Sequence, residues 1–178
     1  FAAGNAFVGQ YLATEGTDGQ LGWGRPFTSR PKALRGYVKY TPKVVTDANG
    51  GDLKKGDMDN GIIYIALVDG TTQDADAADK DYVSGLQQKS WPVIVKTKKE
   101  KRLLFSKGDA NVIAYGEKVF TEATAGDGMI EFEIPIEYFK SNIKAANIVV
   151  TMSASRYGDY FTGGDGSTMW VDDLELVY

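Results

Sequence analysis

The chain has 178 residues, of which 43% are hydrophobic, and a formal net charge of −4 with both signs mixed along it. This length and apolar content predict one folded domain with a real core, and the charge gives no electrostatic reason to expect a nucleic-acid partner. No apolar run approaches the roughly 20 residues of a membrane-spanning helix, so we expect no direct membrane insertion by this segment.

The chain contains no cysteine and no histidine. Disulfides, thiolate nucleophiles, the usual zinc sites and histidine-based triads are therefore excluded. Any acid–base chemistry would use Asp, Glu, Lys or Tyr, and any metal would be a hard, oxygen-bound cation, calcium before magnesium. The sequence begins at Phe1 without an initiator Met or a signal peptide, which indicates a processed chain or a piece of a longer one.

Short runs rich in Val, Ile, Tyr and Phe alternate with clusters of Gly, Asp, Asn and Thr, a pattern typical of strands joined by turns. Helical periodicity is scarce, so the runs predict an all-β fold, a two-sheet antiparallel β-sandwich or jelly roll with its first and last strands close together. In chain order the predicted strands are Asn5–Thr14, Ala33–Thr41, Gly61–Asp69, Trp91–Thr97, Asn111–Glu122, Gly128–Ile136, Asn147–Arg156 and Thr168–Tyr178.

The segments between these strands are expected to be turns and loops. Asp74–Val83 is predicted to be a surface excursion, Lys98–Lys101 a solvated hairpin tip, and Pro135–Asn142 one short helical turn. Asp57–Gly61 resembles a fragment of a calcium-binding loop but lacks the downstream Glu of an EF-hand, so we expect an ordinary turn there.

The strands differ in their expected burial. Ile62–Val68 is apolar on both faces, which predicts a central strand that is covered on both sides. Met129–Ile136 alternates, with Ile130, Phe132, Ile134 and Ile136 inward and Glu131 and Glu133 outward. In Leu34–Tyr40 one face carries Arg35, Tyr37 and Lys39, which suits either a flat polar ligand or an ordinary solvated surface.

The loop after the predicted strand Asn147–Arg156 displays Tyr157, Tyr160 and Phe161 among glycines, which permit turns with positive φ. Aromatic rings on a rigid turn suit the C–H faces of sugars, and Asp159 would bond sugar hydroxyls. The alternative is that these rings plug the end of the core. Trp170 lies inside the last predicted strand, and we expect it in the core.

Asp172 and Asp173 are adjacent in the middle of that last strand. Alternation points them to opposite faces, so at least one is expected to turn toward the interior or its edge, where a charge needs compensation. A calcium ion would provide it, with Asp172 the stronger ligand candidate and Asp173 the weaker. Backbone N–H groups of a turn, or plain solvent, are the alternatives.

A glycan-binding face is predicted from the residue types at the end of the sandwich. No catalytic residue is assigned, because a retaining pair of carboxylates is ~5 Å apart and an inverting pair ~6.5–9.5 Å apart, and a sequence gives no distances. The carboxylates near strand ends are Glu117, Glu122, Glu131, Glu133, Asp159 and Asp165. The residues predicted to bind the glycan are Arg35, Tyr37, Lys39, Tyr157, Asp159 and Tyr160.

Three segments, Gly22–Tyr40, Asn111–Glu117 and Tyr157–Gly164 followed by Val171–Asp173, resemble motifs of the putative carbohydrate metabolism domain, a family of Bacteroides-type bacteria. The resemblance extends over nearly the whole chain. It implies a jelly roll like those of carbohydrate-binding modules (galactose-binding-domain-like) and a role in glycan handling. It also implies export to the outer-membrane surface or periplasm, often as a lipoprotein with a preceding Ig-like domain. It brings no established catalytic residues.

Three functions follow for the single domain 1–178, which we expect to be the C-terminal domain of a longer exported chain. The first is non-catalytic binding of an oligosaccharide or polysaccharide, favoured by the displayed aromatic side chains. The second is a glycoside hydrolase, or another carbohydrate-active enzyme, that uses two carboxylates. The third is a cell-surface adhesion or assembly module.

Overall fold

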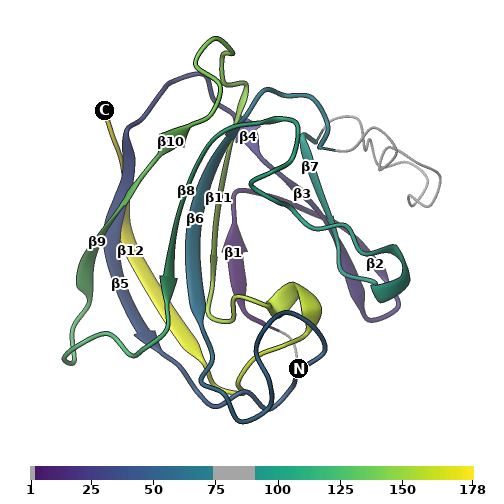
Figure 1. The fold of residues 1–178 in the computed structure, drawn as a ribbon, viewed down its shortest axis with the longest axis vertical. Helices are drawn as coiled ribbons and strands as arrows, with labels where there is room; N and C mark the ends of the chain where they lie inside the picture. Colours follow the sequence, from purple (N-terminus) through teal and green to yellow (C-terminus); the bar gives the residue numbers. More distant parts are fainter. Residues whose placement is uncertain (1–2, 74–90) are drawn as a thin grey trace.

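The computed structural model describes residues 3–73 and 91–178 of the chain. All strand pairs within these residues are antiparallel, and together they form an all-β sandwich, as the sequence predicts. The sandwich has three sheets where two were predicted, because Gly9–Glu15, Asp18–Trp23 and Val93–Lys96 build a separate sheet. Figure 1 shows three layers of strands, with the largest sheet in the middle. The predicted surface excursion at Asp74–Val83 lies outside the described residues.

The middle layer is a six-stranded sheet in the order β1–β11–β6–β8–β10, with β4 paired to β11. On one side of it lies the sheet β12–β5–β9, and on the other the sheet β2–β3–β7. The strands are β1 (Asn5–Phe7), β2 (Gly9–Glu15), β3 (Asp18–Trp23), β4 (Arg25–Pro26), β5 (Ala33–Thr41), β6 (Gly61–Val68), β7 (Val93–Lys96), β8 (Val112–Phe120), β9 (Ile130–Pro135), β10 (Glu137–Tyr138), β11 (Asn147–Ser153) and β12 (Thr168–Val177). The described residues also contain the 3-10 helices η3 (Lys99–Lys101) and η4 (Gly158–Tyr160).

Strand β6 is central and covered on both faces, as predicted from its continuous apolar run. Ile63, Ile65 and Leu67 belong to the core between the middle sheet and β12–β5–β9. Ala66 and Val68, which point the other way, belong to a second core shared with β3 and β7. The molecule therefore has two hydrophobic cores with one sheet between them.

The alternation predicted for β5 and β9 is also confirmed. Leu34, Val38 and Tyr40 are buried on the inner face of β5, whereas Glu131 and Glu133 on β9 are exposed. On the expected inner face of β9, Phe132 and Ile134 are buried, but Ile130 at the start of the strand is 37% exposed. A strand's first residue has few neighbours to cover it, which explains the exception.

Three local predictions need correction. The predicted strand Asn5–Thr14 is two strands, β1 and β2, which belong to different sheets. Strand β3 was not predicted, because its glycines and polar residues hide the alternation; Gly22 is required there since a Cβ would collide with the Trp91 ring. The residues 135–142 contain the short strand β10 in place of a helical turn.

Two further expectations agree with the structure. The first and last strands, β1 and β12, lie in different sheets but line one shallow hollow of about 400 Å³. The basic segment at Lys98–Lys101 forms the tip of a connection in which Lys96 and Leu103 exchange backbone hydrogen bonds. No helix within residues 3–73 and 91–178 is long and apolar enough to cross a membrane.

Candidate functional site

The six predicted ligand-binding residues fall into two separate groups. Arg35, Tyr37 and Lys39 project from the outer face of β5, in the β12–β5–β9 layer. Asp159 and Tyr160 lie in η4 and Tyr157 directly precedes it. Figure 1 places η4 beyond β1, on the other side of the middle sheet from β5. The structure does not bring the two groups together, so we describe each separately.

The outer face of β12–β5–β9 is built by cross-strand pairing with a period of two. Residues of β5 with odd numbers point outward, and their partners on β9 and β12 point the same way. Three rows form the middle of this face. In the order β9, β5, β12 they are Glu133–Arg35–Glu175, Glu131–Tyr37–Asp172 and, across β5 and β12 only, Lys39–Trp170.

Two aromatic rings stand exposed on this face. Tyr37 is 43% exposed and Trp170 is 49% exposed. Since Trp170 pairs with Lys39 and Tyr37 pairs with Asp172, the two rings are diagonal neighbours on adjacent strands, a relation that spans about 7–8 Å. The Lys39 ammonium lies 6.0 Å from the centre of the Trp170 ring. Together these side chains form a flat apolar platform with polar edges.

A shallow hollow of about 480 Å³ adjoins this platform, where β12 bulges between Asp172 and Glu175. The bulge places Asp173 in the left-handed region, with φ +48°, and its N–H donates to Asp172 Oδ1 at 2.9 Å. Leu174 supplies an apolar edge that is 41% exposed. The hollow is lined by Arg35, Gly36, Tyr37, Glu131, Asp173, Leu174 and Glu175.

The two cations of β5 are held by bonds within the protein. The Arg35 guanidinium donates from Nε at 3.0 Å and from Nη2 at 2.8 Å to Glu175 Oε2, which raises the pKa of Arg35. The charges of Glu131 and Glu133 add to that rise. The Lys39 ammonium donates to the backbone oxygen of Asp127 at 2.6 Å. Both side chains are thus fixed in position at the edge of the platform.

The expected burial of Trp170 is wrong. The sequence contained a usable signal, because Trp170 and Asp172 share a face by alternation and a carboxylate favours solvent. Met169 and Val171, on the opposite face, pack against the core. A position inside a strand therefore does not imply burial, because every second side chain of an outer strand faces solvent.

Asp172 and Asp173 are both exposed, so neither turns inward as alternation suggested, because the bulge interrupts the strand there. Solvent and the Asp173 N–H bonded to Asp172 compensate their charge. Within residues 3–73 and 91–178 no group of three or more Asp or Glu side chains is arranged to hold a metal ion. Calcium binding at Asp172 stays a prediction, and main-chain carbonyls and water would have to complete the ligand set.

The aromatic side chains beside η4 pack against a neighbouring loop. The Tyr157 and Tyr160 rings meet edge to face with their centroids 6.3 Å apart, and Tyr157 Oη donates to Asp52 Oδ2 at 2.9 Å. A Cβ on Gly50 would approach the Tyr160 ring at 2.6 Å, so the ring lies directly on that glycine. The Arg102 guanidinium lies 4.8 Å from the Tyr160 ring centre. This packing holds both rings against the loop that contains Gly50 and Asp52.

In the loop between β11 and β12, Gly158 and Gly164 are needed because the chain packs closely there, and not because their φ is positive. The left-handed residues of the loop are Phe161, with φ +57° at the end of η4, and Gly166, with φ +85°. A Cβ on Gly158 would collide with Ala3, and one on Gly164 would lie 2.7 Å from the backbone oxygens of Lys43 and Val44. The prediction that glycine provides the turn is therefore wrong for Gly158 and Gly164, where space is the requirement.

Asp159 lies beneath these rings in a confined place. Burial raises the pKa of its carboxyl, and the nearby Arg102 guanidinium partly opposes that rise. Asp159 lines a cavity of about 30 Å³ together with Trp23, Tyr64 and Arg156. The indole Nε1–H of Trp23 is buried without a hydrogen-bond partner among the described residues. A cavity of this size holds water but not a sugar ring.

Glu117 is a second carboxylate near tyrosines, here Tyr115 and Tyr64. Tyr115 Oη donates to Glu117 Oε2 at 2.9 Å, and the Tyr64 ring lies 5.8 Å from the Tyr115 ring. Burial raises the pKa of Tyr64 well above its usual range, and the charges of Asp159 and Glu117 add to the rise. The charges of Asp159 and Glu117 thus act on the same buried phenol.

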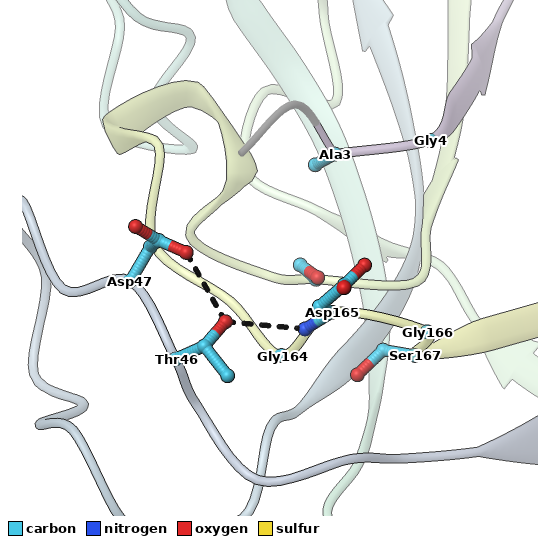
Figure 2. A pocket seen from close by; sticks show the side chains of 9 residues that line it. Ala3, Gly4, Thr46, Asp47, Gly164, Asp165, Gly166 and Ser167 are labelled. Atoms are coloured by element: carbon cyan, nitrogen blue, oxygen red, sulfur yellow. Dashed lines mark hydrogen bonds between the residues drawn. The ribbon is translucent and has the colours of Figure 1, made fainter.

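A third, polar hollow of about 460 Å³ lies where the terminal loop meets the residues before β1. Figure 2 shows Thr46 between Asp47 and Asp165 on one side of the hollow, where Thr46 Oγ1 donates to Asp47 Oδ2 at 3.1 Å and accepts from the Asp165 N–H at 3.3 Å. Its lining contains no aromatic ring. It is formed by Ala3, Gly4, Thr46, Asp47, Ser155, Gly164, Asp165, Gly166 and Ser167.

The segment Asp57–Gly61, predicted to be an ordinary turn, supports this hollow from inside the protein. Asp59 is fully buried. Its Oδ2 accepts from Ser155 Oγ at 2.7 Å and from the Gly164 N–H at 2.9 Å, while Oδ1 accepts from the Asn60 N–H at 2.8 Å. The turn itself lies at Lys55–Gly56, just before the predicted segment, in which Met58 forms a β-bridge with Val44 and Gly61 begins β6. The Asp59 carboxylate has the structural role of joining the loop before β6 to the terminal loop.

Comparisons with known proteins agree with the fold. A crystal structure of a putative glycoside hydrolase from Bacteroides thetaiotaomicron aligns with a TM-score of 0.64 at 22% identity, covering 99% of this chain and 47% of that one. One from Bacteroides vulgatus aligns with a TM-score of 0.55 at 24% identity, covering 98% of this chain and 64% of that one. At these identities the likeness concerns the fold, and the chain spans about half to two thirds of their length.

No curated protein sequence matches the chain. The model of one family, described as the putative carbohydrate metabolism domain, matches residues 1–177, nearly the whole sequence. This agrees with the resemblance carried by the three motifs and with the sandwich fold. The chain therefore belongs to the putative carbohydrate metabolism domain family.

Proposed function

We propose that this domain binds an oligosaccharide or polysaccharide on the outer face of β12–β5–β9, with Tyr37 and Trp170 as the stacking surfaces. The observation that carries the proposal is the exposure of both rings, side by side on a sheet whose other face is the core. Exposed apolar surface of this kind marks a binding site when it is contiguous and rimmed by polar groups. Sugars present such groups with a C–H face for stacking and hydroxyls for hydrogen bonding.

The side chains around the rings supply the polar contacts. Glu131 and Asp172 flank Tyr37 on either side and accept hydrogen bonds from sugar hydroxyls, which are strong when the acceptor is ionised. Arg35 uses Nε and Nη2 toward Glu175 and has further N–H groups to donate. Because the strands are rigid, these groups need little reorganisation to bind.

The site is an open face and not a closed pocket. A polysaccharide chain can therefore lie across it and bind through sugar units from the middle of the chain. Sugar stacking on the two rings of Tyr37 and Trp170, with a few hydrogen bonds, predicts weak binding by a single domain. We expect dissociation constants from micromolar to millimolar, roughly −8 to −4 kcal/mol.

The test is a glycan array followed by titration of a neutral hit against the wild type and the variants Trp170→Ala and Tyr37→Ala. Both variants should lose at least tenfold in affinity while they stay folded. Tyr11→Ala is the matched control, because Tyr11 is 53% exposed but lies on β2 in the other outer layer. Unchanged affinity in both folded platform variants would show that the glycan binds elsewhere.

Glycoside hydrolysis is the second candidate; its acid would be Asp159, whose pKa burial raises, and it requires the cavity of about 30 Å³ beside Asp159 to open and admit a sugar. Burial keeps such a carboxyl protonated at higher pH, as a general acid requires. The two solved structures of the same fold are named putative glycoside hydrolases, which is consistent with this candidate.

Incubating the protein with a glycan that it binds, and measuring new reducing ends, separates the two candidates. Hydrolysis predicts release by the wild type and loss in Asp159→Asn with binding retained. Binding without catalysis predicts no release by either protein.

A further inference from the structure

The proposed glycan-binding face carries an excess of negative charge. The three strands β12, β5 and β9 carry five carboxylates and two cations. Arg35 is paired with Glu175, and Lys39 keeps its positive charge while it bonds the backbone oxygen of Asp127. Two cations against five carboxylates leave a formal charge of −3. The carboxylates are Glu131, Glu133, Asp172, Asp173 and Glu175.

These carboxylates surround the proposed stacking surface. Glu131 and Asp172 are the direct cross-strand neighbours of Tyr37, and Asp173 lines the hollow beside it. All of them are exposed, so none is neutralised by burial. A ligand stacked on Tyr37 and Trp170 therefore lies over a negatively charged surface.

We infer that this face selects glycans by charge: it binds glycans bearing protonated amino groups more tightly than neutral ones and rejects glycans bearing carboxylate or sulfate groups. The inference rests on the proposed function and names its ligand class. An ammonium on a stacked sugar gains attraction from Glu131 and Asp172, whereas a uronate or sulfate meets like charge. Rejection of the wrong ligand by like charge is a common source of specificity.

The expected effects are those of exposed charge pairs. Each carboxylate contributes about a two- to fivefold difference in affinity at low salt. Screening lengths fall from about 10 Å at 0.1 M salt to about 3 Å at 1 M, so the selectivity should shrink as salt is added. Stacking on the aromatic rings is not screened and should remain.

The experiment titrates the protein with hexamers of β-1,4-linked glucose, glucosamine and glucuronic acid, which share a backbone and differ in charge. It is done at about pH 5.5, where the sugar amines are protonated and Asp and Glu side chains are ionised. The proteins are the wild type, Trp170→Ala, and the double variant Glu131→Gln/Asp172→Asn. Glu100→Gln is the control, since Glu100 is exposed on η3, away from the platform strands.

The glucosamine hexamer should bind several-fold more tightly than the glucose hexamer, and the glucuronic acid hexamer several-fold more weakly than the glucose hexamer. The double variant and high salt should each bring the first two affinities together, and Glu100→Gln should change neither. Glucuronic acid binding that matches glucosamine binding and depends on Trp170 overturns the inference and leaves the proposed function standing. Hexamers that bind Trp170→Ala as well as wild type, or that do not bind at all, overturn both.

Discussion

Asp59 and Ser155 are 96 residues apart in the sequence, and the Ser155 hydroxyl donates to the buried Asp59 carboxylate at 2.7 Å. The same oxygen accepts from the Gly164 N–H, so one carboxylate joins the loop before β6 to both ends of the terminal loop. A fully buried charge is tolerated only when its oxygens are bonded in this way. The arrangement of the loops around the polar hollow therefore depends on Asp59.

We predict that Asp59→Ala destabilises the protein by about 3 kcal/mol, because the Ser155 hydroxyl and the Gly164 N–H lose a charged acceptor in a buried place. Urea denaturation followed by fluorescence measures the change. Asp165→Ala is the control from the same hollow, and since Asp165 is exposed its effect should stay within about 0.5 kcal/mol. Equal effects of the two substitutions would contradict the structural role of Asp59.

Substitution by alanine should have very different effects on stability at Trp23 and at Trp170. Trp23 is 1% exposed, so Trp23→Ala should cost about 3–5 kcal/mol of stability. Trp170 is 49% exposed, so Trp170→Ala should change stability by less than about 0.5 kcal/mol while glycan binding falls. Chemical denaturation of both variants tests this, and a large loss of stability in Trp170→Ala would mean that the platform residue is structural.

Asp159 should give the protein a defined pH response. Burial raises its folded-state pKa above the unfolded value, so the folded protein binds this proton more tightly. The contribution of Asp159 to stability is then fully present below its unfolded pKa and is lost as pH rises through its folded pKa. Relative to wild type, Asp159→Asn should therefore become more stable on going from pH 4 to pH 7.

Denaturation of wild type and Asp159→Asn at a series of pH values measures that difference. Subtracting the two curves removes the titration of all other groups. A difference that is flat, or that falls as pH rises, would mean that the attraction of Arg102 outweighs burial at this carboxyl.

Gly164→Ala should destabilise the protein by about 1–3 kcal/mol, because its Cβ would lie 2.7 Å from two backbone oxygens that cannot rotate away. Gly128→Ala is the matched control, since a Cβ on Gly128 meets nothing within 4 Å. The midpoints of thermal unfolding provide the comparison. Similar midpoints for the two variants would show that the Lys43–Val44 backbone yields easily.

Much of the fold could be predicted because burial leaves a periodic trace in strands. Continuous apolar residues predicted the doubly covered β6, and alternation predicted which faces of β5 and β9 are outward. Strand β3 was missed because it contains two glycines, of which Gly22 packs closely against Trp91, and a missing side chain leaves no periodic signal. The division of residues 5–15 between two sheets depends on tertiary pairing, which local pattern does not encode.

The candidate site was predictable only where it lies on strands. Arg35, Tyr37 and Lys39 share a face because of the period of two, and the structure keeps them together. Tyr157 and Tyr160 come from a loop, and the position of that loop is set by packing against Gly50 and Gly51. These glycines are far from the loop in the sequence, so no local pattern reveals the contact. Trp170 had a positional signal that its hydrophobic character obscured.

The position of β6 between two hydrophobic cores has a kinetic consequence. A separate layer covers each face of β6. If either layer detaches, the apolar face of β6 that it covered becomes exposed, while the other face stays covered. Amide protons of β6 should thus exchange with solvent only when the whole molecule opens, and more slowly than those of the edge strands β12 and β2. Strand β6 would be the last part of the chain to lose its protection as denaturant is added.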